Sequence, residues 1–320
     1  MMISRRLLRI KIVQVLYAFC TDENSTLEKS EQELQQSIKK AYDLYHYFIL
    51  LIINVLDHAA ERVDQSKNKI RPTDEDLNPN LKFINNKLII QLKNCDYLFN
   101  YIKYNNLSWH NHPEIIKKLY QKIVGPENFR KYMEIPNPNY DDDKKIIIDI
   151  YSNELEDWES LYQLLEEENI YWNDDIEFVI SMIIKTLQQF KASSINLKLM
   201  NQYKNDDDKE FAKNLLRKTI LKHFEYREII DKYTKNWEID RIAVMDMLIM
   251  EVAMTEILEF PSIPVKVTLN EYIDISRLYS TSKSNEFVNG ILDKIVSDLR
   301  KENKIVKTGR GLKGDSIRNE

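Results

Sequence analysis

Residues 244–258 decide the class of fold, and they read Val-Met-Asp-Met-Leu-Ile-Met-Glu-Val-Ala-Met-Thr-Glu-Ile-Leu. On a helix this stretch is apolar on nearly every side. A helix of that kind is usually buried all round by its neighbours. We therefore expect a central helix that runs from Asp240 to about Leu258. Pro261 and Pro264 then bound a short loop.

The chain on both sides of this stretch also has helical patterns. Two more helices follow it, over about 266–279 and 283–300, and Ser4 can cap a first helix that runs to about Cys20. Residues 64–80 are charged, contain two prolines and are expected to form a loop. Residues 81–205 indicate further helices, although Lys144–Ile150 has the composition of a strand. The sequence predicts an all-α fold.

Glycine is too scarce for several classes of enzyme. The chain has only 5 glycines in 320 residues, and three of them lie in its last dozen positions. Rossmann fingerprints, P-loops and nucleophile elbows all need clustered glycines, because backbone must approach a phosphate or turn sharply there. Nucleotide-binding and hydrolase folds of these kinds are therefore excluded.

The cysteines and the apolar runs bear on the compartment. Cys20 and Cys95 are too few for a disulfide framework, which favours a reducing environment. The longest apolar run, from Tyr45 to Leu56, is shorter than the roughly 20 residues of a membrane span. No signal-peptide pattern follows the basic start of the chain. We expect a cytoplasmic protein with no membrane contact.

The basic residues at the start of the chain are the first local anomaly. The net charge is −5, yet Arg5, Arg6, Arg9 and Lys11 occur without an acid among the first 11 residues. Cations at a helix N-terminus are disfavoured by roughly 0.3–1 kcal/mol each. The cluster is either a harmless solvated end or a patch that binds phosphates. Tyr17 could then offer a ring to a base, or be an ordinary half-buried tyrosine.

The pair Asn289-Gly290 inside the last helix is the second anomaly. Glycine there costs about 1 kcal/mol relative to alanine, and close helix packing is a sufficient explanation for Gly290. The neighbouring residues Lys283, Ser284 and Asn285 form a polar, weakly basic cluster with Asn289. Such a cluster is either functional or an ordinary solvated helix start.

Other polar groups give weaker signals. His110 and His112 lack a companion acid or cysteine, so a surface loop is favoured over a metal site. The acidic runs Asp141–Asp143, Glu166–Glu168 and Asp206–Asp208 are typical of helix caps and exposed faces. No nucleophile has an identifiable base. We expect no catalytic residue, no metal and no cofactor.

Three blocks of the sequence resemble the NusB transcription antitermination family. Residues 5–17, R-R-L-L-R-I-K-I-V-Q-V-L-Y, are similar to the family's R-R-x-A-R-x-x-A-V-Q-A-L-Y. Residues 264–279, P-V-K-V-T-L-N-E-Y-I-D-I-S-R-L-Y, resemble P-x-x-V-A-I-N-E-A-V-E-L-A-K-x-F. Residues 284–293, S-N-E-F-V-N-G-I-L-D, resemble S-x-x-F-V-N-G-V-L-D, which is the specific block.

The resemblance implies a domain organisation. Members of the family are helical bundles of two packed subdomains, and this chain is much longer than most of them. Residues 1–64 and 208–300 would then form the family core, and residues 65–207 a large helical insertion in its N-terminal half. Residues 301–320 are expected to be a disordered basic tail.

The resemblance also implies a function without catalysis. Family members bind boxA-type RNA together with NusE, a ribosomal protein, and join the elongating RNA polymerase to suppress termination. Carried over by position, Arg5, Arg6 and Arg9 would hold RNA phosphates, and Gln14 and Tyr17 would flank the bases or the partner. The remaining implied contacts are Lys283, Ser284, Asn285 and Asn289 for the same RNA groove, and Asp240 and Arg241 for NusE. Asp246 departs from the family, which usually carries a base there, so a partner contact is lost or moved.

Two rival functions stay open at this point. A helical adaptor that has lost RNA binding would fit both the insertion and Asp246. An RNA-modifying enzyme is the second rival, because NusB-like domains also occur fused to RNA methyltransferases. The scarcity of glycine argues against that enzyme, whose cofactor loop is glycine-rich.

Overall fold

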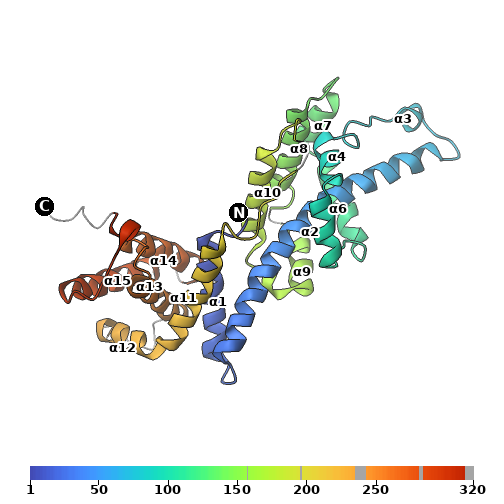
Figure 1. Cartoon of the computed structure of the whole chain (residues 1–320). Coiled ribbons are helices and arrows are strands. Elements are labelled where there is room, and N and C mark those ends of the chain that lie inside the picture. The colour runs from blue at the N-terminus through green and yellow to red at the C-terminus, as the bar shows by residue number, and fades with distance from the viewer. Residues whose placement is uncertain (157, 195–196, 235–242, 281–283, 314–320) are drawn as a thin grey trace. The chain divides into compact units, whose positions relative to one another are not determined.

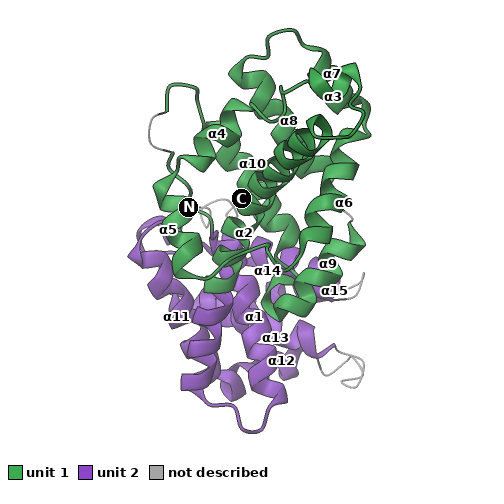
Figure 2. Cartoon of the chain, turned by 90° about the vertical axis from the view of Figure 1, so that its right-hand side faces the viewer, with its two compact units in different colours: residues 1–2, 39–202 green, residues 3–38, 203–320 purple. Residues whose placement is uncertain are grey.

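The structure is a computed structural model, and it describes all residues except 157, 195–196, 235–242, 281–283 and 314–320. Within the described part the chain is helical and contains no strand, as Figure 1 shows. The predicted all-α fold is confirmed. The chain divides into two compact units, coloured in Figure 2.

Unit 2 contains residues 3–38 and 203–320. It therefore includes all three sequence blocks that resemble the NusB family. Its central helix is α13 (Val244–Glu259), on which four other helices of the unit and α1 (Arg5–Thr21) all pack. Those four are α11 (Asp206–Leu221), α12 (His223–Thr234), α14 (Val265–Tyr279) and α15 (Ser284–Lys301). Every residue from Asp246 to Ile257 is buried, which confirms the expected central helix. The helix begins at Val244, after the cap residue Ala243, and not at Asp240 as expected.

Unit 1 contains residues 39–202 together with residues 1–2. The long helix α2 (Leu27–Lys67) contributes its first residues to unit 2 and the rest, from residue 39, to unit 1. The units therefore divide at residues 38 and 202, whereas the sequence suggested boundaries at 64 and 207. The other helices of unit 1 are α3 (Asp74–Leu77), α4 (Lys87–Lys93), α5 (Asp96–Tyr104), α6 (Pro113–Val124), α7 (Glu127–Glu134), α8 (Tyr140–Asn153), α9 (Glu159–Glu168), η1 (Ile170–Trp172) and α10 (Ile176–Gln189).

The strand-like stretch Lys144–Ile150 lies within helix α8. Asn139 caps this helix, since its side-chain oxygen accepts hydrogen bonds from the backbone N–H groups of Asp141 and Asp142. Ile146, Ile147 and Ile150 are buried on one face. Capping and one-sided burial thus override the β-propensity of the isoleucines.

The segment after α15 differs from the expected disordered tail over the residues that are described. The backbone N–H of Thr308 donates to the Pro261 carbonyl at 3.0 Å, and Lys307 Nζ donates to the Phe260 carbonyl at 3.1 Å. Ile305 packs against a core cluster that includes Ile257. Residues 304–312 therefore form a strap over the loop between α13 and α14.

Gly311 lets this strap lie close to that loop. A Cβ atom at Gly311 would collide with the carbonyl oxygen of Pro261. Gly311 itself is buried within the short helix η3 (Gly309–Leu312). Only glycine fits here without a shift of the backbone.

None of the described helices combines the length and the apolar character needed to cross a bilayer.

Candidate nucleic-acid interface

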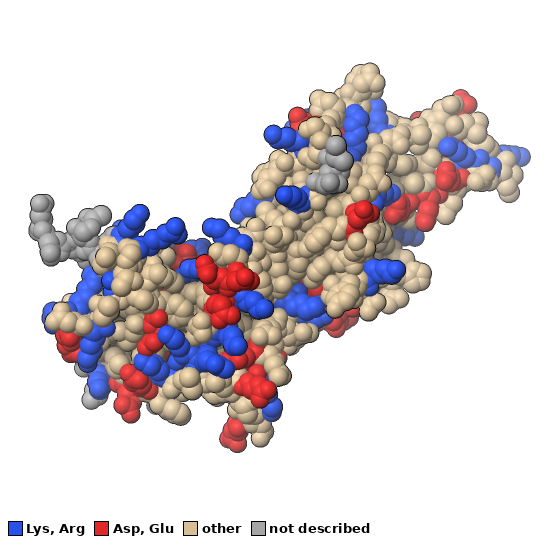
Figure 3. All heavy atoms as spheres, in the orientation of Figure 1, with Lys and Arg blue, Asp and Glu red and all other residues tan. Residues whose placement is uncertain are grey.

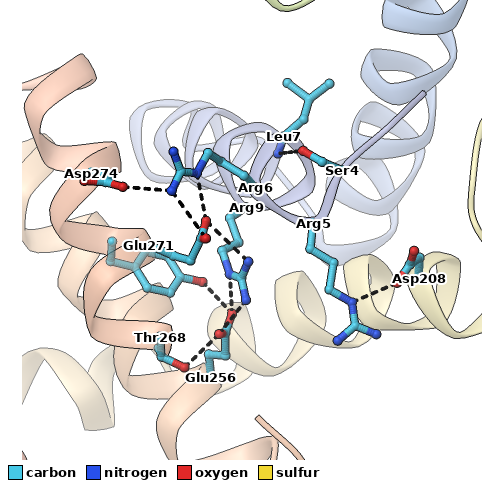
Figure 4. A network of polar contacts seen from close by, with 11 residues as sticks. Ser4, Arg5, Arg6, Leu7, Arg9, Asp208, Glu256, Thr268, Glu271 and Asp274 are labelled. Atoms are coloured by element: carbon cyan, nitrogen blue, oxygen red, sulfur yellow. Dashed lines mark hydrogen bonds and ion pairs between the residues drawn. The ribbon is translucent and has the colours of Figure 1, made fainter. Parts of the chain in front are cut away.

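Helix α1 begins at the arginine cluster because Ser4 caps it. The Ser4 hydroxyl oxygen accepts a hydrogen bond from the Leu7 backbone N–H at 3.2 Å, which satisfies one of the open N–H groups of the first turn. The first turn itself contains no acid. Carboxylates from three other helices approach the arginines instead, as Figure 4 shows.

Arg9 is buried and points into the protein. Its side chain is 4% exposed, and it forms two hydrogen bonds with Glu256, Nε to Oε2 at 2.7 Å and Nη2 to Oε1 at 2.8 Å. Burial opposes the charged form, but the hydrogen bonds and charge of Glu256 outweigh it and raise the pKa of Arg9 above its ordinary value. The expectation that Arg9 holds an RNA phosphate is wrong, because a buried carboxylate already occupies its donors.

Glu256 is a junction between three helices. Besides Arg9 of α1, it accepts hydrogen bonds from Thr268 Oγ1 at 2.8 Å and from the Tyr272 hydroxyl at 3.1 Å, both on α14. Burial, and then the charge of Glu256, raise the pKa of the Tyr272 phenol well above its usual value. The tyrosine therefore stays protonated and remains a donor. This network fixes the start of α1 against α13 and α14.

Arg6 lies at the surface between two acids of α14. Its side chain is 47% exposed and contacts Glu271 at 3.0 Å and Asp274 at 2.7 Å. The hydrogen bond to Glu271 is the main reason why the pKa of Arg6 is raised. Exposed ion pairs of this kind are worth less than about 1 kcal/mol, so an incoming phosphate can compete for Arg6.

Arg5 has one carboxylate partner among the described residues, whereas Arg6 has two. The Arg5 side chain is 41% exposed, and Asp208 binds it through Nε alone at 2.8 Å. Its guanidinium carbon lies 4.9 Å from the centre of the Phe211 ring. Figure 4 shows the two terminal nitrogens directed away from Asp208. They can therefore donate to another anion.

A surface hollow of about 450 Å³ lies between α14 and α15. Asp274 stands at its edge, where one carboxylate oxygen binds Arg6 at 2.7 Å and the other binds Arg277 at 3.3 Å. The lining residues are Asn270, Ile273, Asp274, Arg277, Asn285, Glu286 and Asn289. The start of α1 and the start of α15 thus approach the same part of α14.

Gln14 and Tyr17 lie further along α1. The Gln14 side-chain amide donates to the Tyr279 hydroxyl at 3.3 Å, so part of its hydrogen-bonding capacity is used inside the protein. Tyr17 is 43% exposed, which leaves ring surface for a base or a partner. Of the two, Tyr17 is the better candidate for an external contact.

Ser284 is buried and does not line the hollow. It is 2% exposed, and its hydroxyl donates to Asp246 Oδ2 at 2.8 Å. The expectation that Ser284 lines an RNA groove is therefore wrong. Asp246, also buried, here holds the start of α15 against α13. Lys283, Asp240 and Arg241, the other residues expected to contact RNA or NusE, lie outside the described residues.

Sequence reasoning missed the residues that α14 contributes. Asn270, Asp274 and Arg277 follow one another at spacings of four and three positions, which places them on one face of a helix. That polar stripe could have predicted an exposed polar face on α14. Nothing in the sequence could have predicted Glu256 and Glu271 as partners of the arginines, because they are about 250 positions away from them.

Charges of both signs surround this site. On the face drawn in Figure 3, both basic and acidic side chains lie over the part that contains α11 to α15. Arg5, Arg6 and Arg9 each have a carboxylate partner. The surface is thus suited to weak, competitive binding of an anion.

The weaker candidates have structural roles. His112 contacts Glu168 at 2.8 Å on the surface, and Asp143 is buried and accepts a hydrogen bond from the Tyr132 hydroxyl at 2.7 Å. Across the described residues there is no cluster of histidine, cysteine and acidic side chains that could hold a metal ion.

Comparison with known proteins identifies a family for part of the chain. Residues 177–297 match the NusB family, a range that includes α11 to most of α15 but not α1. A protein of Salinibacter ruber described as "Transcription antitermination protein NusB" is 45% identical over 106 residues, which are 33% of this chain and 66% of that protein. No solved structure matches.

Two further relatives carry the same description. The protein of Chloroherpeton thalassium is 38% identical over 104 residues, or 32% of this chain and 49% of the relative. The protein of Natranaerobius thermophilus is 33% identical over 97 residues, or 30% of this chain and 70% of the relative. The chain thus spans between about half and about two thirds of the length of the first two relatives.

Proposed function

Because the chain belongs to the NusB family, we propose that it is a transcription antitermination factor that binds boxA-type single-stranded RNA together with NusE. The complex joins the elongating RNA polymerase and supports processive transcription of ribosomal RNA. The names of the three relatives support the antitermination role. The chain contributes by binding, without catalysis and without a cofactor, and it acts in the cytoplasm where RNA is made.

The exposure of Arg5 and Arg6 carries this proposal. Both guanidiniums lie at the surface, and each is held by carboxylates in a place that a phosphate can reach. Single-stranded RNA needs neutralisation of its backbone and polar or planar groups for its splayed bases. The two arginines neutralise the backbone phosphates. The amides of Asn285 and Asn289 and the ring of Tyr17 are the polar and planar groups for the bases.

A second protein on the RNA is physically reasonable. A phosphate must displace carboxylates from Arg6, and few other phosphate contacts are available, so the affinity of this chain alone is modest and salt-sensitive. A basic ribosomal protein such as NusE would add contacts to the same RNA. It would also match the net charge of −5 on this chain.

The test is a pull-down with purified NusE and labelled boxA RNA. We expect the unmutated chain to retain both, and the double variant Arg5→Glu/Arg6→Glu to retain NusE but lose the RNA. Arg9 is left unchanged, because a glutamate beside buried Glu256 would unfold the protein. Lys117→Glu/Lys118→Glu, on the exposed face of α6 in unit 1, is the matched control. Failure of the unmutated chain to retain RNA at low salt would contradict the proposal.

A helical adaptor without RNA binding is the second candidate. The observation that favours it is the pairing of Arg5, Arg6 and Arg9 with carboxylates of the same chain. In that case the pull-down retains NusE or polymerase, and the RNA is absent at every salt concentration.

The division of the chain supports a proposal about its organisation. Unit 2 is built from residues on both sides of unit 1 in the sequence, and the family match lies mostly in unit 2. We infer that the part of unit 1 before the family match, residues 39–176, is an insertion into the family domain, which keeps α1 as its first helix.

A further inference from the structure

The end of helix α2 and the turn that follows it project from unit 1 as an arm, residues 61–81. Figure 1 draws the end of α2 and the short helix α3 beyond the other helices of the unit. No side chain of the arm is buried. Because most helical stability comes from packing, the arm adds nothing to the core of unit 1. Its exposed surface calls for another role.

Local polar contacts hold the arm in one shape. The Lys69 ammonium contacts a carboxylate oxygen of Asp76 at 2.8 Å, which ties the tip of the arm, residues 67–71, to α3. Thr73 and Asp76 form a capping box at the start of α3, with hydrogen bonds of 3.0 and 3.2 Å. At the base of the arm, Asn80 Nδ2 donates to the Met133 carbonyl of α7 at 2.9 Å. The tip and α3 therefore lie side by side and form one surface.

This surface carries exposed apolar side chains. Ile70 in the tip is fully exposed, and Leu77 at the end of α3 is 52% exposed. Isoleucine and leucine are among the residues that folded proteins most often bury completely. A second molecule that covers Ile70 and Leu77 would remove their apolar area from water, which favours association.

The charges of the arm are separated into two groups of opposite sign. The tip holds three bases and no acid, and α3 holds three acids and no base. The contact between Lys69 and Asp76 uses one charge of each group. The other four charged side chains are exposed and form no ion pair among the described residues, and they are Lys67, Arg71, Asp74 and Glu75.

We propose that the arm binds the arm of a second copy of this chain and forms a symmetric dimer. In a two-fold contact the same patch serves both partners, so the patch must be complementary to itself. The arm meets this condition, because the basic tip of one copy can face the acidic α3 of the other at two equivalent places. Ile70 and Leu77 of both copies are then covered between these charged contacts. The contact area is small, so the dimer is weak and its population depends on concentration.

An RNA partner fits this surface less well. The bases of the tip could contact phosphates, but the three acids of α3 beside them would repel a polyanion. The surface is complementary to a partner that carries both signs of charge, and a second arm carries both. RNA binding by the tip is therefore a measured outcome of the test.

Sedimentation equilibrium of the full chain at low salt, from micromolar to submillimolar concentration, measures the association. We expect a monomer–dimer equilibrium that added salt weakens. Lys67→Glu/Arg71→Glu reverses the charge of the tip, and Asp74→Lys/Glu75→Lys reverses that of α3. Both variants keep the contact between Lys69 and Asp76. Each variant alone should dimerise at least about tenfold more weakly, because like charges then meet.

An equimolar mixture of the two charge variants gives the sharpest result. Each acidic tip then faces a basic α3, and each basic tip faces an acidic α3. The mixture should regain the affinity of the unmutated chain to within about threefold. Recovery on mixing also shows that both variants are folded.

The apolar part of the contact has its own control. Ile70→Asp should weaken the dimer at least about tenfold, because it places two like charges in the covered centre. Ile170→Asp, at a 77% exposed isoleucine of η1 in the same unit, is the matched control and should leave the dimer unchanged.

Three results would overturn the arm-to-arm contact. They are a monomer over the whole concentration range, a dimer that persists in both charge variants, and charge variants that are folded by circular dichroism but do not associate when mixed. If the unmutated chain is monomeric and Lys67→Glu/Arg71→Glu weakens boxA RNA binding about tenfold, the tip binds nucleic acid instead. The inference does not rest on the proposed function, since a dimer that is lost in each charge variant and restored on mixing supports it even where the RNA pull-down fails.

Discussion

The guanidinium of Arg9 and the carboxylate of Glu256 form a buried pair, with N···O distances of 2.7 and 2.8 Å. The two residues are 247 positions apart in the sequence. Their pairing makes α1 an integral part of unit 2, although the family match does not include α1. Arg9 thus positions the helix that displays Arg5 and Arg6.

Removal of Glu256 should be strongly destabilising. Glu256→Leu leaves the Arg9 charge buried without its carboxylate, which typically costs about 3–5 kcal/mol. Arg9→Leu should cost less, because Thr268 and Tyr272 still donate to Glu256. Denaturant unfolding of the two single variants and the double variant measures this. A double variant whose loss equals the sum of the single losses would show that the pair is not coupled.

The C-terminal strap should depend on Gly311. Gly311→Ala forces a Cβ atom into the Pro261 carbonyl, and overpacking of this kind costs about 1–3 kcal/mol. We expect the strap to detach and residues 304–312 to become sensitive to limited proteolysis. Gly290→Ala, where the added atom meets open space, is the control. Equal resistance of the strap in both variants would contradict this contact.

Unit 1 should lose stability in acid because of His46. The ring is buried and stacks on Tyr101 at 3.8 Å between centroids. Burial lowers the pKa of His46 to about 4 from an ordinary 6.5. The native state therefore disfavours the protonated form, and stability present above pH 6.5 is lost as the pH falls toward 4, by about 3 kcal/mol.

Denaturant unfolding at pH 7 and pH 4.5 measures this loss, with His46→Phe as the comparison. Phenylalanine keeps an aromatic ring against Tyr101 and cannot be protonated. The variant should lose less stability than the unmutated chain over this range. An identical loss in both proteins would assign the acid sensitivity to other groups.

The central helix and the first helix could be predicted from sequence for simple physical reasons. Residues 244–258 are apolar all round, which fixes burial without knowledge of the neighbours. Ser4 caps α1 as expected because capping is a local interaction. Lys144–Ile150 shows the limit of local composition, since isoleucines with strand propensity lie in a helix that has one buried face.

The candidate site was less predictable because it depends on contacts that are distant in sequence. Nothing near Arg9 in the sequence indicates that it is buried against Glu256, whereas Arg5, four positions earlier on the same helix, stays exposed. Ser284 and Asn285 are neighbours, yet one is buried against Asp246 and the other lines the hollow. Whether such a residue is buried or exposed depends on which side of the helix it lies and on the packing around it. A sequence motif alone does not contain this information.

The most direct test of the central claim is the salt dependence of boxA RNA binding to the full chain, compared between the unmutated protein and Arg5→Glu/Arg6→Glu. Each phosphate contact on a single strand contributes about 0.7 to the slope of log K against log salt. We predict that the double variant binds at least about tenfold more weakly at low salt and loses about 1.4 from that slope. Equal affinities and equal slopes in the two proteins would contradict the account.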